Sequence, residues 1–321
     1  MMSLLSVRHL TTEFYSGGRW LEAVSDVSFD LRPGEILGLV GESGCGKSTI
    51  AYSVMRLLAR NARISAGEVW LEDVNLTEAS EDALQDLRGR RLSMIFQDPM
   101  TALDSLFTVG HQVVETLQEH LELEPPAARE RALALLRQVG IPAAEERFGA
   151  YPYQFSGGMS QRIALAIAIS CHPQVLIADE PTTALDVTIQ AQILHLIRRL
   201  LVEEQGAGVL LITHDLGVVA QVCDRVAVMY AGKIVEFGTV DSIFGEPLHP
   251  YTQALLNSLP SQGIQRGALE NIRGRVPSLD DRPAGCRFHP RCPHAAAICR
   301  EEAPPLLQRA NGQEVACVLY D

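Results

Sequence analysis

The chain has 321 residues, 47% of them hydrophobic, which is enough for one large hydrophobic core and a smaller appendage. Its formal net charge is −12, so it lacks the basic composition of proteins that wrap nucleic acid. No apolar run reaches the ~18 residues of a membrane-spanning helix, and the N-terminus shows no export signal. We therefore expect a cytoplasmic protein with no nucleic-acid partner.

Short apolar runs predict the strands of an α/β core. Ile36–Val40, Val175–Ala178 and Val209–Thr213 are each followed by polar, loop-like residues. Uninterrupted apolar runs of this length are typical of buried strands in a mainly parallel sheet, where active residues lie at the strand ends. Val226–Tyr230 and Ile234–Phe237 flank a short turn and predict a β-hairpin near the end of the large domain.

The middle of the chain has a helical pattern instead. Val109–Leu121 and Ala127–Val139 place apolar residues at helical spacing, so we expect a helical subdomain over about residues 98–173. This subdomain would interrupt a large domain of residues 1–245. Residues 246–321 hold nine of the seventeen prolines and predict a loop-rich C-terminal extension.

A glycine-rich segment follows the first predicted strand and precedes a predicted helix from Thr49 to Leu58. Its residues are Gly41-Glu42-Ser43-Gly44-Cys45-Gly46-Lys47-Ser48. Glycines allow backbone N–H groups to converge on phosphates, Lys47 would reach the β- and γ-phosphate oxygens, and Ser48 would offer its hydroxyl to Mg²⁺. The alternative interpretation is a glycine-rich turn without a ligand.

Carboxylates and an imidazole follow two other predicted strands. Asp179 and Glu180 come after Val175–Ala178, where the first would bind Mg²⁺ and the second would deprotonate the water that attacks the γ-phosphate. His214 follows the next predicted strand and would hydrogen-bond the γ-phosphate. A single histidine in such a place is more often structural.

A second candidate anion site precedes the predicted helix Gln161–Ser170. Ser156, Gly157 and Gly158 would expose backbone N–H groups at the positive end of this helix. One ATP cannot easily use two such sites on one chain, so this site would serve the nucleotide of a partner subunit in a head-to-tail dimer. The alternative is a simple helix cap.

The order of these segments resembles that of the ABC-transporter ATPases over residues 5 to about 240. The motifs that carry the resemblance are the phosphate loop, Gln97, Phe155–Met159, Asp179-Glu180, Ala184-Leu185-Asp186 and His214. The resemblance implies a P-loop ABC-type nucleotide-binding domain that hydrolyses Mg-ATP. It also implies that Gln97 senses Mg²⁺ and the permease, that Asp186 contacts the facing subunit, and that Tyr15 stacks on adenine, with Trp20 as the alternative.

The C-terminal extension resembles that of ATPases serving dipeptide and oligopeptide importers, through Leu248–Leu256 and Gly285–Pro293. This likeness implies an ATPase at the cytoplasmic face of the inner membrane that energises peptide uptake. Its partners would be a related second ATPase in a heterodimer, two transmembrane permeases and an extracytoplasmic binding protein. Alternatives are nickel, glutathione or opine import, a soluble ABC ATPase of translation or DNA repair, and a non-hydrolysing subunit.

Four of the seven cysteines, Cys286, Cys292, Cys299 and Cys317, fall within this extension, separated by five, six and seventeen residues. Disulfides are disfavoured in the cytoplasm, and the extension has little apolar material with which to stabilise itself. A metal centre would supply the constraint. Similar peptide-importer ATPases suggest a [4Fe–4S] cluster, with Zn²⁺ or free thiols as alternatives.

Overall fold

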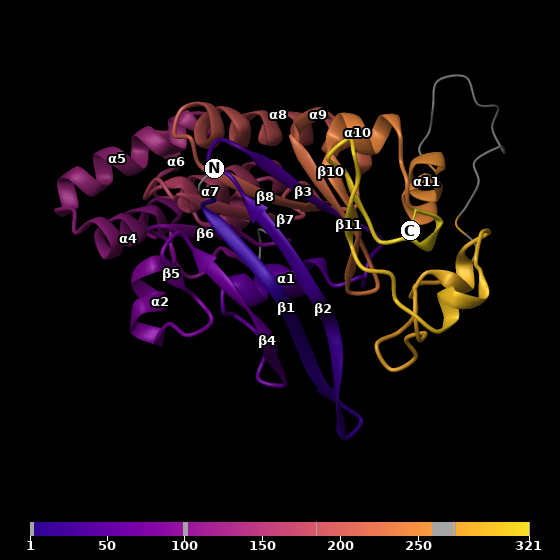
Figure 1. The fold of residues 1–321 in the computed structure, drawn as a ribbon. Coiled ribbons are helices and arrows are strands. Elements are labelled where there is room, and N and C mark those ends of the chain that lie inside the picture. The colour runs from indigo at the N-terminus through magenta and orange to yellow at the C-terminus, as the bar shows by residue number, and fades with distance from the viewer. Residues whose placement is uncertain (1–2, 99–101, 184, 259–271, 273, 321) are drawn as a thin grey trace. The chain divides into compact units, whose positions relative to one another are not determined.

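A computed structural model of the chain describes all residues except 1–2, 99–101, 184, 259–271, 273 and 321 (Figure 1). The chain packs into two units, each made of separate stretches. The first unit comprises Met1–Leu5, Leu31–Ile36 and Glu78–Leu211, and the second unit comprises Ser6–Asp30, Leu37–Thr77 and Ile212–Asp321.

The second unit contains a sheet that the sequence pattern did not predict. Its strands, in the spatial order β2-β1-β4-β5, are β1 (Leu5–Ser16), β2 (Arg19–Leu31), β4 (Ala62–Leu71) and β5 (Val74–Asn75). Gly17 and Gly18 connect β1 to β2 with φ angles of 57° and 82°. Positive φ at both central residues is what a two-residue hairpin turn requires. Polar residues interrupt these strands, so no apolar run marks them.

A second, mixed sheet of this unit has the order β11-β12-β10-β9-β3. The strands are β3 (Ile36–Val40), β9 (Arg225–Tyr230), β10 (Lys233–Thr239), β11 (Leu307–Gln308) and β12 (Glu314–Val315). The pair β3 and β9 is parallel, whereas β9 and β10 form the antiparallel hairpin that the sequence predicted. Because β12 pairs with β10, the C-terminal extension adds strands to this sheet (Figure 1).

The helices of the second unit are short. They are α1 (Lys47–Val54), α9 (Leu216–Val222), α10 (Val240–Gly245) and α11 (Pro250–Asn257), with 3₁₀ turns at His289–Arg291, Ala297–Arg300 and Val318–Tyr320. Helix α1 begins two residues before the predicted Thr49 and ends before the predicted Leu58. It stops early because Arg56, one residue past the C-cap, adopts a left-handed φ of 55°.

The first unit contains β6 (Leu92–Ile95), β7 (Val175–Asp179) and β8 (Gly208–Thr213) in the order β8-β7-β6. Strands β6 and β7 pair in parallel, and every residue of β7 is buried. Its helices are α2 (Glu81–Leu87), α4 (Val109–Leu121), α5 (Pro125–Gln138), α6 (Ala144–Arg147), α7 (Gly157–Ile169) and α8 (Val187–Ile197), with a 3₁₀ turn at Pro152–Gln154 and a π-helical turn at Arg198–Glu203.

Two of these helices match helices predicted from the sequence. Helix α4 has both predicted ends, and its buried residues Val109, Val113 and Leu117 recur every four positions. Helix α5 begins two residues earlier than predicted, because prolines are favoured in a first helical turn. Residues 99–101, part of the predicted subdomain, lie outside the described residues.

Among the residues that the structure describes, no helix is both long enough and apolar enough to cross a bilayer. The predicted domain boundary at residue 245 does not coincide with the division into two units, since the extension packs with the N-terminal strands in one unit. The domain boundary stays a prediction.

Candidate functional site

The predicted phosphate loop lies in the second unit, directly after the fully buried strand β3. Two of its glycines cannot be replaced without a clash. A Cβ at Gly41 would lie 2.2 Å from the carbonyl oxygen of Met229, and one at Gly46, where φ is 108°, would lie 3.0 Å from that of Ala23. Cys45 is buried within the loop, and burial raises the pKa of its thiol. The loop therefore keeps its backbone close to neighbouring strands.

Lys47 begins helix α1 and is almost fully buried. Its Nζ donates hydrogen bonds to the carbonyl oxygens of Gly41 and Glu42, at 2.7 and 3.2 Å. Ser48 and Thr49 complete the first turn and are half-buried. A helix N-terminus beside a lysine ammonium is suited to binding a phosphate chain.

In the first unit, Gln97 and Glu180 come together although 83 positions separate them. Gln97 Nε2 donates to Glu180 Oε2 at 3.2 Å, and Thr183 Oγ1 donates to the same oxygen at 2.9 Å. Asp179 is buried as the last residue of β7. Glu180 has a positive φ of 46°, a rare conformation for a residue with a side chain and one that concentrates at functional sites.

The second candidate anion site also lies in the first unit, at the N-terminus of α7. The helix begins at Gly157 rather than at the predicted Gln161, so both glycines belong to its first turn. Ser156 is the N-cap residue, but its side chain accepts no capping hydrogen bond. Asp186 caps the next helix, because its Oδ1 accepts a bond from the N–H of Ile189 at 2.9 Å. Ala184, in the neighbouring motif, lies outside the described residues.

Two further predicted residues lie in the second unit. His214 is exposed and directly follows β8. Tyr15 is 49% exposed, and its ring centroid lies 5.3 Å from that of Trp20, which is 37% exposed. Arg63 covers the Trp20 ring at 4.0 Å. The two aromatic alternatives therefore stand side by side, and both remain open.

The four cysteines of the extension line one small cavity of about 10 Å³. That is room for about one water molecule. Burial raises the pKa of Cys286, Cys292 and Cys317, the last to about 11. In the described part of the chain, no group of three or more His, Cys, Asp or Glu side chains is arranged to hold a metal ion. The thiols thus share a cavity without a coordinating arrangement, and the metal centre stays a prediction.

Comparison with known proteins decides the family. Residues 24–183 match the family model described as "ABC transporter", and residues 235–299 match "Oligopeptide/dipeptide transporter, C-terminal region". The probable peptide ABC transporter ATP-binding protein y4tR of Sinorhizobium fredii is 50% identical over 98% of this chain and 94% of its own length. The oligopeptide transport ATP-binding protein AppD of Bacillus subtilis is 48% identical over 100% and 98%. The chain belongs to the ATP-binding proteins of ABC transporters.

Solved structures agree with this ABC ATPase fold. A dimeric structure of the ATP-binding cassette MJ0796, bound to ADP and phosphate in a post-hydrolysis state, superposes with a TM-score of 0.66 at 26% identity. It covers 74% of this chain and 98% of the cassette. The predicted α/β cassette fold is confirmed.

The structure shows two contacts in this ABC ATPase that the sequence did not predict. Glu42 of the phosphate loop pairs with Arg291 of the extension, and its N–H donates to the hydroxyl of Tyr251. Both tail residues lie in the motifs of the extension, Leu248–Leu256 and Gly285–Pro293, but 249 and 209 positions separate Arg291 and Tyr251 from Glu42. No spacing rule connects residues so far apart.

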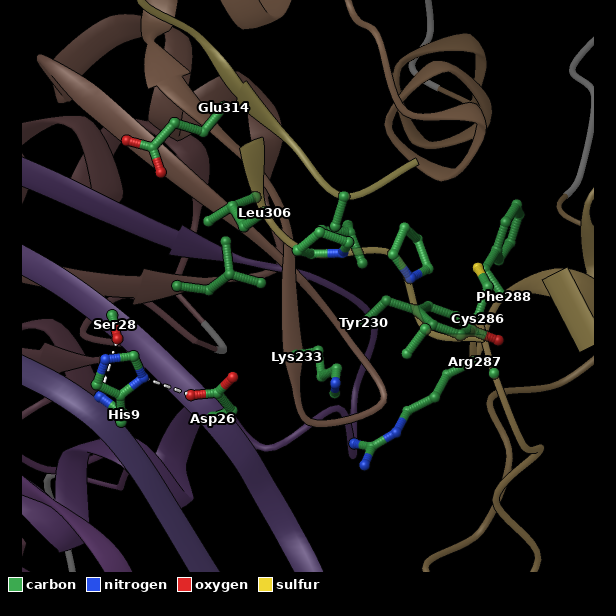
Figure 2. Close-up of a pocket in the computed structure, with 17 residues that line it drawn as sticks. His9, Asp26, Ser28, Tyr230, Lys233, Cys286, Arg287, Phe288, Leu306 and Glu314 are labelled. Atoms are coloured by element: carbon green, nitrogen blue, oxygen red, sulfur yellow. Dashed lines mark hydrogen bonds and ion pairs between the residues drawn. The ribbon is translucent and has the colours of Figure 1, made fainter. Parts of the chain in front are cut away.

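A larger cavity of about 480 Å³ lies in the second unit (Figure 2). Its walls come from β1 and β2, from the β9–β10 hairpin and from the extension. His9 Nδ1 and Asp26 Oδ1, 2.7 Å apart, mark one wall, while Lys233 and Leu306 mark others (Figure 2). Of the residues predicted to form sites, only Cys286 lines this cavity, so it is distinct from the phosphate loop.

Proposed function

We propose that this chain is the ATP-hydrolysing subunit of an importer that carries di- and oligopeptides across the cytoplasmic membrane. The observation that carries the proposal is similarity along the whole chain, extension included, to ATP-binding proteins named for peptide transport. A further example is the dipeptide transport ATP-binding protein DppD of Escherichia coli, 45% identical over 98% of this chain and 96% of its own length. The extension also matches a region described for oligopeptide and dipeptide transporters.

The second unit would bind the nucleotide. The backbone N–H groups of residues 41–49 face the phosphates, Lys47 exchanges its loop carbonyls for β- and γ-phosphate oxygens, and His214 hydrogen-bonds the γ-phosphate. Tyr15 or Trp20 stacks on adenine. Support for this arrangement comes from the buried ammonium of Lys47, which is already directed at the loop.

The first unit would supply the hydrolytic groups. Asp179 and Gln97 provide oxygen ligands of the kind that Mg²⁺ prefers, and the hydroxyl of Ser48 in the second unit is a ligand of the same kind. Glu180 accepts the proton of the attacking water as the water oxygen bonds to the γ-phosphorus and the bond to the β,γ-bridging oxygen breaks. The hydrogen bond from Gln97 and the strained backbone of Glu180 support a fixed orientation of that carboxylate.

The exposed start of α7 would complete the site of a partner subunit. Ser156, Gly157 and Gly158 turn their N–H groups to the partner's γ-phosphate, and Asp186 lies at the subunit contact. We infer a heterodimer with a related ATPase, docked on two permeases at the cytoplasmic face of the inner membrane. An extracytoplasmic binding protein delivers the peptide.

A [4Fe–4S] cluster held by Cys286, Cys292, Cys299 and Cys317 is part of the proposal, with Zn²⁺ as the alternative. Four thiols lining one cavity support it. The group would brace a segment that has few apolar side chains. Anaerobic purification should give a brown protein absorbing near 400 nm with about four iron atoms per chain. Zinc without iron would favour the alternative, and a metal-free protein with an undisturbed fold would refute both.

The cargo is tested in cells that lack this chain. Uptake of a labelled dipeptide, of nickel and of glutathione is measured in the intact strain, in the disrupted strain and after complementation. We expect only dipeptide uptake to fall on disruption and to return on complementation. Loss of nickel or glutathione uptake with normal dipeptide uptake would contradict the assigned cargo.

A further inference from the structure

The C-terminal extension is hydrogen-bonded to the phosphate loop at Glu42. The guanidinium of Arg291 holds both carboxylate oxygens of Glu42, with Nη1 2.7 Å from Oε2 and Nη2 3.1 Å from Oε1. From another part of the extension, the hydroxyl of Tyr251 accepts a hydrogen bond from the Glu42 backbone N–H at 3.0 Å. Side chain and backbone of one loop residue are therefore both bonded to the extension.

These contacts are shielded from water. The side chain of Arg291 is 5% exposed and that of Glu42 is 29% exposed. Tyr251 is fully buried, and its ring lies 4.7 Å from that of Tyr230 and 5.4 Å from that of Phe288. A bidentate arginine–carboxylate pair is stronger than a surface ion pair, and more so when both groups are shielded.

Arg291 and Tyr251 both stay protonated, as these contacts require. Burial lowers the pKa of Arg291, but its hydrogen bonds to Glu42 and Tyr230 raise that pKa by a larger amount. The pKa therefore lies above its ordinary value, and the guanidinium stays charged. Burial raises the pKa of Tyr251, so its hydroxyl stays neutral and can accept the backbone N–H. Arg291 also donates to the Tyr230 hydroxyl at 3.3 Å, which anchors the guanidinium to the end of β9.

We propose that the extension positions the phosphate loop for ATP, with Arg291 and Tyr251 as positioning residues that hold Glu42 neutralised and turned away from the phosphates. The inference rests on the proposed function, since it assigns the phosphates to this loop. It gives the extension a part in nucleotide binding.

The physical reason is the charge of Glu42. This carboxylate is the second residue of a loop whose N–H groups and Lys47 converge to bind a highly anionic ligand. An unpaired carboxylate there would repel the triphosphate and would compete for the Lys47 ammonium. Pairing with Arg291 removes most of that repulsion, so loss of the arginine harms nucleotide binding only while the carboxylate is present.

The test is a double-mutant cycle on nucleotide affinity in the full chain. Binding of the non-hydrolysable analogue AMP-PNP with Mg²⁺ is measured by calorimetry for wild type, Arg291→Ala, Glu42→Gln and the double variant. Arg291→Ala should weaken binding about tenfold, within the usual range of coupling between sites. In the Glu42→Gln background, Arg291→Ala should have no further effect, so the two substitutions should be strongly non-additive.

Matched variants separate positioning from general damage. Arg287→Ala removes another half-buried arginine of the extension, one that bonds the Ala231 carbonyl and Glu22 rather than the loop, and should leave affinity unchanged. Tyr251→Phe keeps the ring and should weaken binding about threefold. Thermal unfolding of each variant confirms that it is folded.

The outcomes distinguish this inference from the proposed function. If wild type fails to bind AMP-PNP, the proposed function is wrong. If wild type binds but Arg291→Ala binds equally well, or loses the same factor with and without the Glu42 carboxylate, the positioning role is wrong and the proposed function stands.

Discussion

The two units carry different parts of the proposed reaction. The second unit holds the phosphate loop, with a buried ammonium at Lys47 and an ion pair that ties Glu42 to the extension. The first unit holds Asp179 and Glu180 together with the exposed helix start at Gly157. The second unit thus offers positive charge and N–H groups to a nucleotide, whereas the first offers carboxylates and a second anion site.

This division implies that nucleotide affinity and nucleotide turnover can be separated by substitution. Changes in the second unit should weaken binding of the first ATP. Changes in the first unit should leave that binding intact and block hydrolysis or subunit closure.

The largest effect is expected from Glu180→Gln in the first unit. The amide keeps the shape of the side chain but cannot take the proton of the attacking water, and loss of a general base typically costs ~10²–10⁴ in rate. ATP turnover of the assembled complex should fall at least about a hundredfold, while AMP-PNP affinity stays near that of wild type. Near-normal hydrolysis would remove Glu180 from its role.

Gly157→Asp, also in the first unit, should prevent ATP-dependent dimerisation. The carboxylate would stand beside the γ-phosphate of the partner's nucleotide. The matched control is Gly157→Ala, because an added Cβ would lie at an ordinary van der Waals distance of 3.8 Å from Leu185 Cδ2. Light scattering or crosslinking should show closure for the alanine variant alone. An aspartate variant that dimerises normally would contradict the shared site.

Lys47→Ala tests the second unit. A hydrogen bond to a charged group contributes ~1.5–3 kcal/mol, so AMP-PNP affinity should fall about tenfold or more. The folded state should persist, since the hydrogen bonds that Lys47 makes to the Gly41 and Glu42 carbonyls and to the Cys45 Sγ all lie within the loop. Calorimetry on the isolated chain measures the effect. Unchanged affinity would count against the assigned loop.

The smallest expected effect is a pH dependence of stability in the second unit. Burial lowers the pKa of His249 to about 3, below the ~6.5 of an unfolded histidine. The unfolded state therefore takes up a proton first, and stability falls as pH drops below 6.5, by about 1.4 kcal/mol between pH 7.5 and 5.5. Above that range the contribution is constant.

His249→Asn is the control for this titration. Asparagine can still cap α11, as the His249 Nδ1 does by accepting from the Tyr251 N–H at 3.0 Å, but it does not titrate. Glu236 accepts a hydrogen bond from the backbone N–H of His249, and burial raises the pKa of the Glu236 carboxyl. The raised carboxyl pKa favours the folded state as the pH falls, opposite to the effect of His249, and it is present in both wild type and the variant. The plot of denaturation midpoint against pH should therefore have a different slope for wild type and for His249→Asn. Equal slopes would contradict the neutral buried histidine.

Local features of the fold were predictable because each depends on a short stretch of chain. Strand β3 has five consecutive buried residues, and the glycine-rich segment follows it directly along the chain. The start of α7 was predicted too late, because glycines are poor helix formers in general, although they are tolerated in a first turn that offers its N–H groups to a ligand.

The remaining features depend on contacts distant in sequence. The long strands β1 and β2 were not predicted, because polar positions interrupt them and their pairing, rather than an apolar run, defines them. The pairs Gln97 with Glu180 and Glu42 with Arg291 join residues 83 and 249 positions apart. Motif order pointed to the first pair only by analogy and gave no sign of the second.

The central claim, that ATP hydrolysis on this chain drives peptide import, is tested most directly in proteoliposomes that contain the complete complex. Uptake of a labelled dipeptide is followed with ATP supplied on the side of this chain, for wild type and for Glu180→Gln. We expect ATP-dependent uptake with wild type and none above background with the variant. Uptake that continues with Glu180→Gln, or ATP hydrolysis by wild type without any dipeptide uptake, would contradict the account.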